Sequence, residues 1–192
     1  MMGAVPSDEA NSKKSAILDA ALAKFSAYGF ARTSMADIAA AADMSRPALY
    51  QHFANKEEIF RAMLSRLLES AVDDALHALE ADGPLADQLD ASLQRWAGDL
   101  TETFRATEHG VDLIEAKAAY AKPVVDAANK RLLEGLAVHL DASASGRGRE
   151  LTELLILSSI GLKYDQPSMP LLRSRLRSLA ESVALNAEQT SP

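Results

Sequence analysis

The sequence has no cysteine among its 192 residues, so disulfide bonds, thiolate metal ligands and cysteine nucleophiles are all excluded. Aromatic residues are also scarce, at 5% of the chain, whereas alanine and leucine are abundant. Because alanine and leucine are strong helix formers, this composition predicts an all-α protein. Hydrophobic residues at 48% and charged residues at 24% are ordinary for a globular chain that can bury a substantial core.

Long apolar segments are missing as well. The first residues, MMGAVPSDEANSKKS, lack the apolar centre of a signal peptide. The longest uncharged apolar run, from Leu154 to Leu162, is too short to cross a bilayer. We therefore expect a cytoplasmic protein without a membrane partner. No phosphate-binding glycine loop, serine elbow or spaced set of metal ligands occurs either, so we predict no enzyme, no cofactor and no metal ion.

The chain also lacks an overall positive charge, because its formal net charge is −7. The charges are unevenly distributed, however. Residues 1–65 carry seven basic and seven acidic side chains, while the remaining residues carry 13 basic and 20 acidic ones. A neutral N-terminal part would not coat DNA indiscriminately, and any nucleic-acid binding there must depend on local cationic groups and helix N-termini.

The stretch from Arg32 to Lys56 predicts two short helices joined by a tight turn, followed by a third. In the first helix, apolar residues fall at helical spacing from Met35 to Ala42, and Ser34 precedes them with Asp37 three residues later, which is close to a capping box. The turn follows at Asp43, one of the few residue types other than glycine that tolerate a positive φ.

The second short helix is predicted to begin after Ser45 as its N-cap, with Pro47 in its first turn. Leu49 and Phe53 would then face inward. Asn55 would cap the third helix with Glu58 at its N3 position. A helix, a short turn and a second helix that begins with small and polar residues are typical of a helix-turn-helix unit, which places its second helix in the major groove of DNA.

The order of these residues resembles the DNA-binding domain of the tetracycline-repressor (TetR/AcrR) family over roughly residues 12–60. One departure is Asp43, where the family usually has glycine. Beyond about residue 65 only the helical layout can be compared. The residues that carry the resemblance are Leu18, Phe25, Gly29, Phe30, Thr33, Ser34, Ile38, Ala39, Ala42, Asp43, Met44, Ser45, Leu49, Tyr50, His52, Phe53, Asn55 and Lys56.

The domain organisation follows from the helical pattern and the resemblance together. We expect a disordered tail at residues 1–11, a three-helix helix-turn-helix DNA-binding domain at 12–60, and a helical ligand-binding and dimerisation domain at 61–192. About nine helices are predicted in all. They include a long one from 56 to about 81 and others at about 85–105, 110–120 and 123–140.

DNA contacts are predicted on the second helix of the unit and at the helix N-termini beside it. Arg46 is the best candidate for a bidentate contact with guanine, because its guanidinium matches the base edge. The predicted base-contacting residues are Ser45, Arg46, Pro47, Ala48 and Gln51, and the predicted phosphate-contacting residues are Thr33, Ser34, Tyr50, His52 and Lys56.

The resemblance also implies a homodimer and an effector site. The last two predicted helices, at about 151–162 and 168–185, would form a four-helix bundle with a second copy. Their predicted interface residues are Leu151, Leu155, Ser158, Leu162, Leu172, Leu176, Leu179 and Val183. The predicted effector pocket consists of Trp96, Leu100, Phe104, His109, Leu113 and Tyr120, although such apolar side chains at helical spacing also occur in ordinary cores.

These patterns favour a homodimeric transcriptional repressor that binds double-stranded DNA at a palindromic operator and is released by a small-molecule effector. An activator is also compatible with the architecture. One alternative is a helical adaptor or architectural protein without operator specificity, whose binding would not respond to charge removal around Arg46. Another is an enzyme using the acidic residues near Glu108, for which turnover of a candidate ligand would be the evidence.

Overall fold

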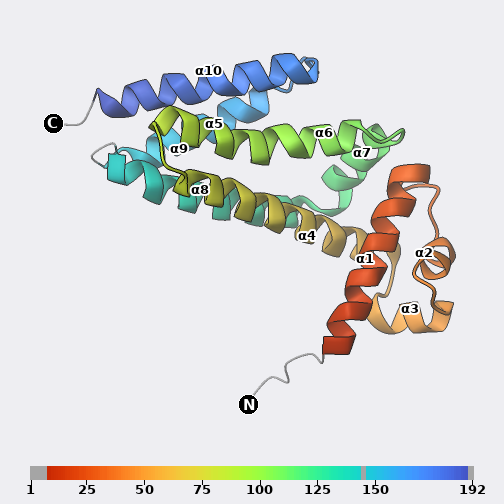
Figure 1. The fold of residues 1–192 in the computed structure, drawn as a ribbon. Helices are drawn as coiled ribbons and strands as arrows, with labels where there is room; N and C mark the ends of the chain where they lie inside the picture. The colour runs from red at the N-terminus through yellow and green to blue at the C-terminus, as the bar shows by residue number, and fades with distance from the viewer. Residues whose placement is uncertain (1–7, 144–145, 190–192) are drawn as a thin grey trace. The chain divides into compact units, whose positions relative to one another are not determined.

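The computed structural model describes residues 8–143 and 146–189, and every regular element in these ranges is helical (Figure 1). The predicted all-α class is confirmed. The elements are α1 (Asp8–Tyr28), α2 (Met35–Ala41), α3 (Arg46–His52), α4 (Lys56–His77), a short 3₁₀ turn (Ala78–Glu80), α5 (Leu85–Leu93), a π-helical segment (Gln94–Asp99), α6 (Leu100–Arg105), α7 (Gly110–Tyr120), α8 (Lys122–Ser143), α9 (Gly148–Gly161) and α10 (Met169–Glu188).

The N-terminal boundary of α1 differs from the prediction. Residues 8–11 are helical, whereas the sequence placed them in a disordered tail. The other predicted tail residues, 1–7, lie outside the described part of the chain.

The chain forms two compact units that do not coincide with the predicted division at residue 60. One unit contains the residues up to Leu67 together with Phe104–Val124, and the other contains Leu68–Thr103 together with the residues from Val125 onward. Helix α4 therefore contributes to both units, and α7 belongs with the helix-turn-helix rather than with the C-terminal helices. None of the helices described is long and apolar enough to span a bilayer.

Three phenylalanine rings form the centre of the first unit. They belong to Phe25 of α1, to Phe30 in the segment after α1, and to Phe60 of α4. The ring centroids lie 5.1–5.7 Å apart, and all three side chains are almost completely buried. Such tilted and edge-on pairs are the favourable geometry for aromatic rings. Ile38 of α2 and Leu49 of α3 are also fully buried, so both short helices are fixed to this core.

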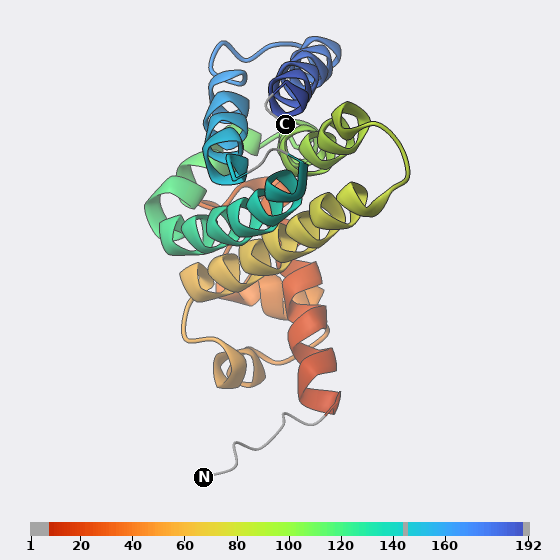
Figure 2. The ribbon, with the colours of Figure 1, turned by 90° about the vertical axis from the view of Figure 1, so that its left-hand side faces the viewer.

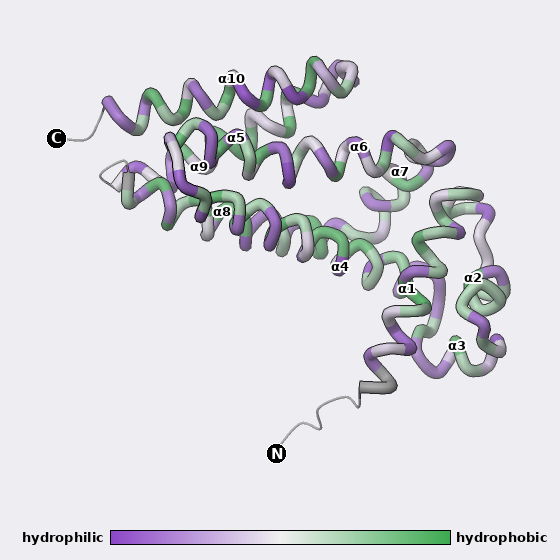
Figure 3. Tube along the Cα trace, in the orientation of Figure 1, coloured by the Kyte–Doolittle hydropathy of each residue, from purple (hydrophilic) through white to green (hydrophobic). Residues whose placement is uncertain are grey.

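The second unit consists of packed helices. Helices α4 and α8 lie side by side and run in the same direction (Figures 1 and 2), and the Asp73 carboxylate of α4 pairs with Arg131 of α8. Helix α10 packs along α5, with Leu172 and Leu176 fully buried. Hydrophobic and hydrophilic positions alternate along α10 in Figure 3, as expected for a helix with one buried face.

The start of α9 lies against the backbone of α8. The amide of Gly148 donates to the Asp141 carboxylate over 2.7 Å. A Cβ atom at position 148 would lie 2.4 Å from both the Ala137 carbonyl oxygen and the Asp141 amide nitrogen. Because these are backbone atoms, they cannot move aside as a side chain could. This approach of the two helices therefore requires glycine at position 148.

Candidate nucleic-acid interface

The N-terminus of α2 is closed by the predicted capping box. The Ser34 hydroxyl accepts a hydrogen bond from the Asp37 amide at 3.3 Å, and the Ser34 amide donates to the Asp37 carboxylate at 2.8 Å. The Ser34 hydroxyl also donates to the same carboxylate at 2.6 Å. These bonds hold the pKa of Asp37 below its ordinary value, the side-chain bond being the larger cause. The box therefore fixes where α2 begins.

The turn between α2 and α3 has the geometry that the sequence predicts. Asp43 adopts φ 52°, in the left-handed region, although it occupies the place of the family's usual glycine. The Met44 amide donates to the Ala39 carbonyl at 3.0 Å, which closes the end of α2. An aspartate tolerates this conformation because its short polar side chain crowds the backbone less than a branched one.

Helix α3 begins at the predicted cap and presents the predicted face. The Ser45 hydroxyl accepts from the Ala48 amide at 3.3 Å, and Pro47 lies in the first turn. Leu49 is buried against the core, as is Phe53 at the end of the helix. The residues on the opposite side remain accessible: Ser45, Arg46, Pro47, Tyr50 and Gln51 are exposed, and Ala48 and His52 are half-buried.

The exposed face of α3 carries one cation next to an aromatic ring. The guanidinium carbon of Arg46 lies 5.8 Å from the centroid of the Tyr50 ring, one helical turn away. This cation–π contact restrains the arginine while leaving its N–H donors free to meet an acceptor. The five predicted base-contacting residues are therefore together at one accessible end of the first unit.

Two of the predicted phosphate-contacting residues form hydrogen bonds within the domain. The Thr33 side chain is 3% exposed, and its hydroxyl donates to the Gly29 carbonyl at 2.7 Å. The Lys56 ammonium donates to the carbonyl oxygens of Phe30, Ala31 and Thr33 at 2.8–3.1 Å and lies 4.6 Å from the centroid of the Phe30 ring. Its three donors are thus all engaged by the segment that leads into α2.

The predicted cap of α4 is confirmed. The Asn55 side-chain oxygen accepts from the Glu58 amide at 2.8 Å. The Glu58 carboxylate in turn accepts from the Ala54 amide at 2.7 Å. Lys56 is consequently held at the first position of a well-closed helix, which places its ammonium against the preceding segment.

The contacts between α7 and the segment after α1 were not anticipated from the sequence. One Arg32 nitrogen lies 2.8 Å and 3.1 Å from the two ring nitrogens of His109, and the Ala31 amide donates to the Asp112 carboxylate at 3.2 Å. The Tyr120 ring lies 5.2 Å from the Phe30 ring. No local pattern signals these contacts, because they join residues about 80 positions apart.

The six predicted pocket residues are divided between the two units. Trp96, which is buried, and Leu100, which is half-buried, belong to the second unit. Half-buried Phe104, buried Leu113 and the remaining two belong to the first. His109 contacts Arg32, and the Tyr120 ring lies 5.2 Å from the Phe30 ring.

Most of the predicted dimer residues face the interior of their own chain. Leu151, Leu155, Leu172, Leu176 and Val183 are 0–2% exposed, and Ser158, Leu162 and Leu179 are half-buried. Helix α9 is apolar on more than one side, so its sequence alone does not identify the outward side. The accessible apolar residues on these two helices are Leu154, Leu157 and Ile160 on α9, exposed by 52%, 69% and 52%, and Leu171 and Leu185 on α10, exposed by 46% and 59%.

Comparisons with known proteins agree with this geometry. Residues 17–63 match the model for bacterial regulatory proteins of the tetR family. The chain is 40% identical over 78 residues to the probable HTH-type transcriptional regulator ArpR of Pseudomonas putida, covering 41% of this chain and 37% of that protein. It is 43% identical over 63 residues to the HTH-type transcriptional regulator TtgR of the same species, covering 33% of this chain and 30% of that protein.

The aligned regions thus span only about a third of the length of these curated relatives. The fold similarity extends further. A TetR-family transcriptional regulator from Streptomyces coelicolor, SCO4454, superimposes with a TM-score of 0.68 at 19% identity, covering 97% of this chain and 98% of the other. The helices after residue 63 therefore share the fold of that regulator, and residues 17–63 are similar to the DNA-binding domain of bacterial regulatory proteins of the tetR family.

Proposed function

We propose that this protein is a DNA-binding transcriptional regulator that acts as a homodimeric repressor at a palindromic operator. The observation that carries the proposal is the exposed face of α3, where Arg46, Pro47 and Gln51 stand together on a helix whose other side is buried. An α-helix of this kind fits the major groove, where side chains distinguish all four base pairs.

Within this proposal, Arg46 contacts a guanine and the neighbouring small side chains pack against bases. Ser34, Tyr50 and His52 fix the register by contacting phosphates, together with backbone amides at the helix N-termini. The neutral charge of residues 1–65 supports site-dependent rather than general binding, because non-specific affinity scales with the number of phosphates neutralised.

Lys56 and Thr33 support the interface without touching DNA in this proposal. The Lys56 ammonium ties together three carbonyl oxygens just before α2, and Thr33 closes the same segment from within. Their role is to hold the N-terminus of α2, including Ser34, at a constant position. Lys56 is therefore a positioning residue.

The second copy is proposed to pack on the outward sides of α9 and α10. Leu154, Leu157 and Ile160 lie within two turns of one helix, and their exposure is unusual for side chains of this size. A two-fold dimer would present two α3 helices to the two halves of a palindrome. The interface thus uses the two helices that the sequence indicated but their opposite side.

Release of DNA by a small molecule is the remaining part of the proposal. The effector must bind the conformer that does not bind DNA more tightly, and DNA must then weaken effector binding by the same factor. The candidates for the effector pocket remain Trp96, Leu100, Phe104, His109, Leu113 and Tyr120.

The test is a selection of random duplex DNA with the purified full-length protein, sequenced after several rounds. We expect enrichment of a two-fold symmetric site whose half-sites are separated by about one helical turn or somewhat more. Absence of enrichment at low salt, with the protein shown to be folded by circular dichroism, would reject the repressor proposal.

A further inference from the structure

A π-helical segment interrupts the helix that the sequence predicts between residues 85 and 105. Gln94–Asp99 forms hydrogen bonds of the i to i+5 type between α5 and α6, and Trp96, Ala97 and Gly98 within it are buried. Such segments are rare and usually short, because the wider turn packs less well than an α-helical one. No proline lies between residues 85 and 105 to impose the interruption. We therefore consider the side chains that contact the segment from another helix.

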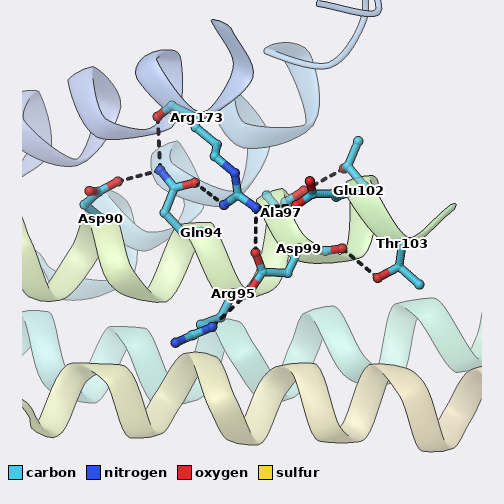
Figure 4. Close-up of polar contacts among 9 residues, drawn as sticks. Asp90, Gln94, Arg95, Ala97, Asp99, Glu102, Thr103 and Arg173 are labelled. Atoms are coloured by element: carbon cyan, nitrogen blue, oxygen red, sulfur yellow. Dashed lines mark hydrogen bonds and ion pairs between the residues drawn. The ribbon is translucent and has the colours of Figure 1, made fainter. Parts of the chain in front are cut away.

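One such side chain is Arg173 of α10 (Figure 4). One of its terminal nitrogens donates to the Gln94 side-chain oxygen at 3.1 Å, and the other donates to the Asp99 carboxylate at 2.9 Å. Gln94 and Asp99 are the first and the last residues of the segment. A single guanidinium thus connects both of its ends.

Further contacts complete this group, which we call the Arg173 clamp (Arg173, Gln94, Asp99, Glu102 and Asp90). The second Arg173 nitrogen also donates to the Glu102 carboxylate at 2.6 Å. The Gln94 amide group donates to Asp90 at 2.7 Å and to the Arg173 carbonyl at 3.0 Å (Figure 4). Both carboxylates that Arg173 contacts raise the pKa of its guanidinium, with Asp99 as the larger cause.

Glycine at position 98 makes room for the guanidinium. A Cβ atom there would lie 3.0 Å from an Arg173 nitrogen and 3.0 Å from the Gln94 side-chain oxygen. Any other residue would press on the contact between these two groups. Arg173 therefore forms hydrogen bonds with the two end residues of the segment, and Gly98 between them leaves room for its guanidinium.

The clamp distinguishes between two helical registers. In an α-helix of 3.6 residues per turn, positions five apart point about 140° away from each other. Gln94 and Asp99 could not then face the same guanidinium. In the wider π turn, positions five apart lie on more nearly the same side of the helix. Relaxation of the segment to α geometry would remove one contact and turn the start of α6, at Leu100, by about 100° relative to α5.

We propose that Gln94–Asp99 can adopt either π-helical or α-helical geometry and that Arg173 stabilises the π-helical form. A displacement of α10 would then change the rotation of α6 about its axis. All five residues of the Arg173 clamp lie in the second unit, and the proposal does not depend on the proposed DNA binding. It assigns to Arg173 a positioning role, in which its two nitrogens hold the ends of the segment on one face.

The chain contains a built-in reporter for this proposal. Trp96 is the only tryptophan in the sequence, lies in the middle of the segment and is 7% exposed. Its emission in the full-length protein therefore reports on this segment alone. The experiment compares emission wavelength and acrylamide quenching of the wild type with Arg173→Met, Arg173→Lys and Arg175→Met.

The two Arg173 variants separate charge from geometry. Lysine keeps the positive charge but replaces two nitrogens with one, so it cannot contact both ends as arginine does. Arg175→Met is the matched control, because Arg175 pairs with Asp165 and the Leu162 carbonyl and does not contact the segment. All variants are first shown to retain wild-type helicity by far-ultraviolet circular dichroism.

We expect both Arg173 variants to shift Trp96 emission to longer wavelength and to raise its quenching constant roughly twofold or more, as local opening requires. Arg175→Met should match the wild type. If Arg173→Met does not fold, Arg173→Lys decides the question. Wild-type emission and quenching in a folded Arg173→Lys protein would overturn the proposal, as would an equal change in Arg175→Met.

Discussion

Two cationic side chains of the first unit have similar chemistry but different surroundings. Arg46 and Lys56 both lie in the helix-turn-helix region. The sequence predicts a base contact for Arg46 and a phosphate contact for Lys56. In the structure Arg46 is exposed beside Tyr50, whereas all three donors of Lys56 are engaged by carbonyl oxygens. The two residues therefore predict different consequences when they are replaced.

Arg46→Ala should weaken binding to the preferred DNA site by about 1–3 kcal/mol, because a bidentate contact with one base is lost. Specificity should relax at a single base position and remain elsewhere. The measurement is the sequence profile from a binding selection. Lys14→Ala, which removes an exposed cation from α1, serves as the control for loss of charge and should leave the profile unaltered.

Lys56→Met should lower the free energy of unfolding by roughly 1–2 kcal/mol, since three charge-assisted hydrogen bonds at a half-buried position are removed. The dependence of DNA affinity on salt should keep its slope, because no phosphate contact is lost. Thermal unfolding and binding at several salt concentrations measure the two quantities. An unchanged stability combined with a slope reduced by about 0.9 would return Lys56 to the phosphate-contacting role.

At the scale of elements, local signals were predicted well and long-range ones were not. The caps at Ser34, Ser45 and Asn55 and the left-handed turn at Asp43 depend on neighbours within four residues, so the sequence predicts them directly. The π segment depends on Arg173, about 75 positions further along. The pattern of residues 85–105 is that of a continuous helix, and nothing local in it indicates the interruption.

The cap of α2 gives the prediction that belongs to this scale. Ser34→Ala should destabilise the domain at neutral pH, and N-cap serines typically contribute about 1 kcal/mol. The Asp37 pKa is lowered in the folded state, so its contribution is present above its ordinary value of 3.8 and is lost as pH falls through the lower folded value.

The difference in stability between wild type and Ser34→Ala should therefore decrease below pH 4, and the Asp37 pKa should rise in the variant. Urea unfolding at several pH values and NMR titration of the carboxylate measure the two effects. A stability difference that stays constant down to pH 2 would show that the Asp37 half of the capping box contributes nothing.

At the scale of the whole molecule, the apolar spacing of the last two helices does not show which of their sides faces outward. Leu151, Leu155 and Leu176 have the helical spacing of an interface, yet they form the interior of their own unit. A periodic apolar pattern shows that a face is buried without showing what buries it. The assignment of α7 to the first unit was missed for the same reason.

Leu157→Arg should convert the proposed dimer into a monomer without unfolding it, because Leu157 is 69% exposed within the chain and a buried charge in the interface is costly. Sedimentation velocity measures the oligomeric state. Val138→Arg is the matched control, since Val138 on α8 is 74% exposed and lies on neither interface helix. A Leu157→Arg protein that still sediments as a dimer would place the interface elsewhere.

Helix α9 begins and ends with glycine, and the two positions impose opposite constraints on sequence divergence. Gly148 is enclosed by the backbone of α8, so no second substitution can compensate for a side chain there. Gly161 has nothing within 4 Å of the place where a Cβ would lie. Among descendants of this chain, position 148 should remain invariant, while position 161 is free to drift except where a second subunit restricts it.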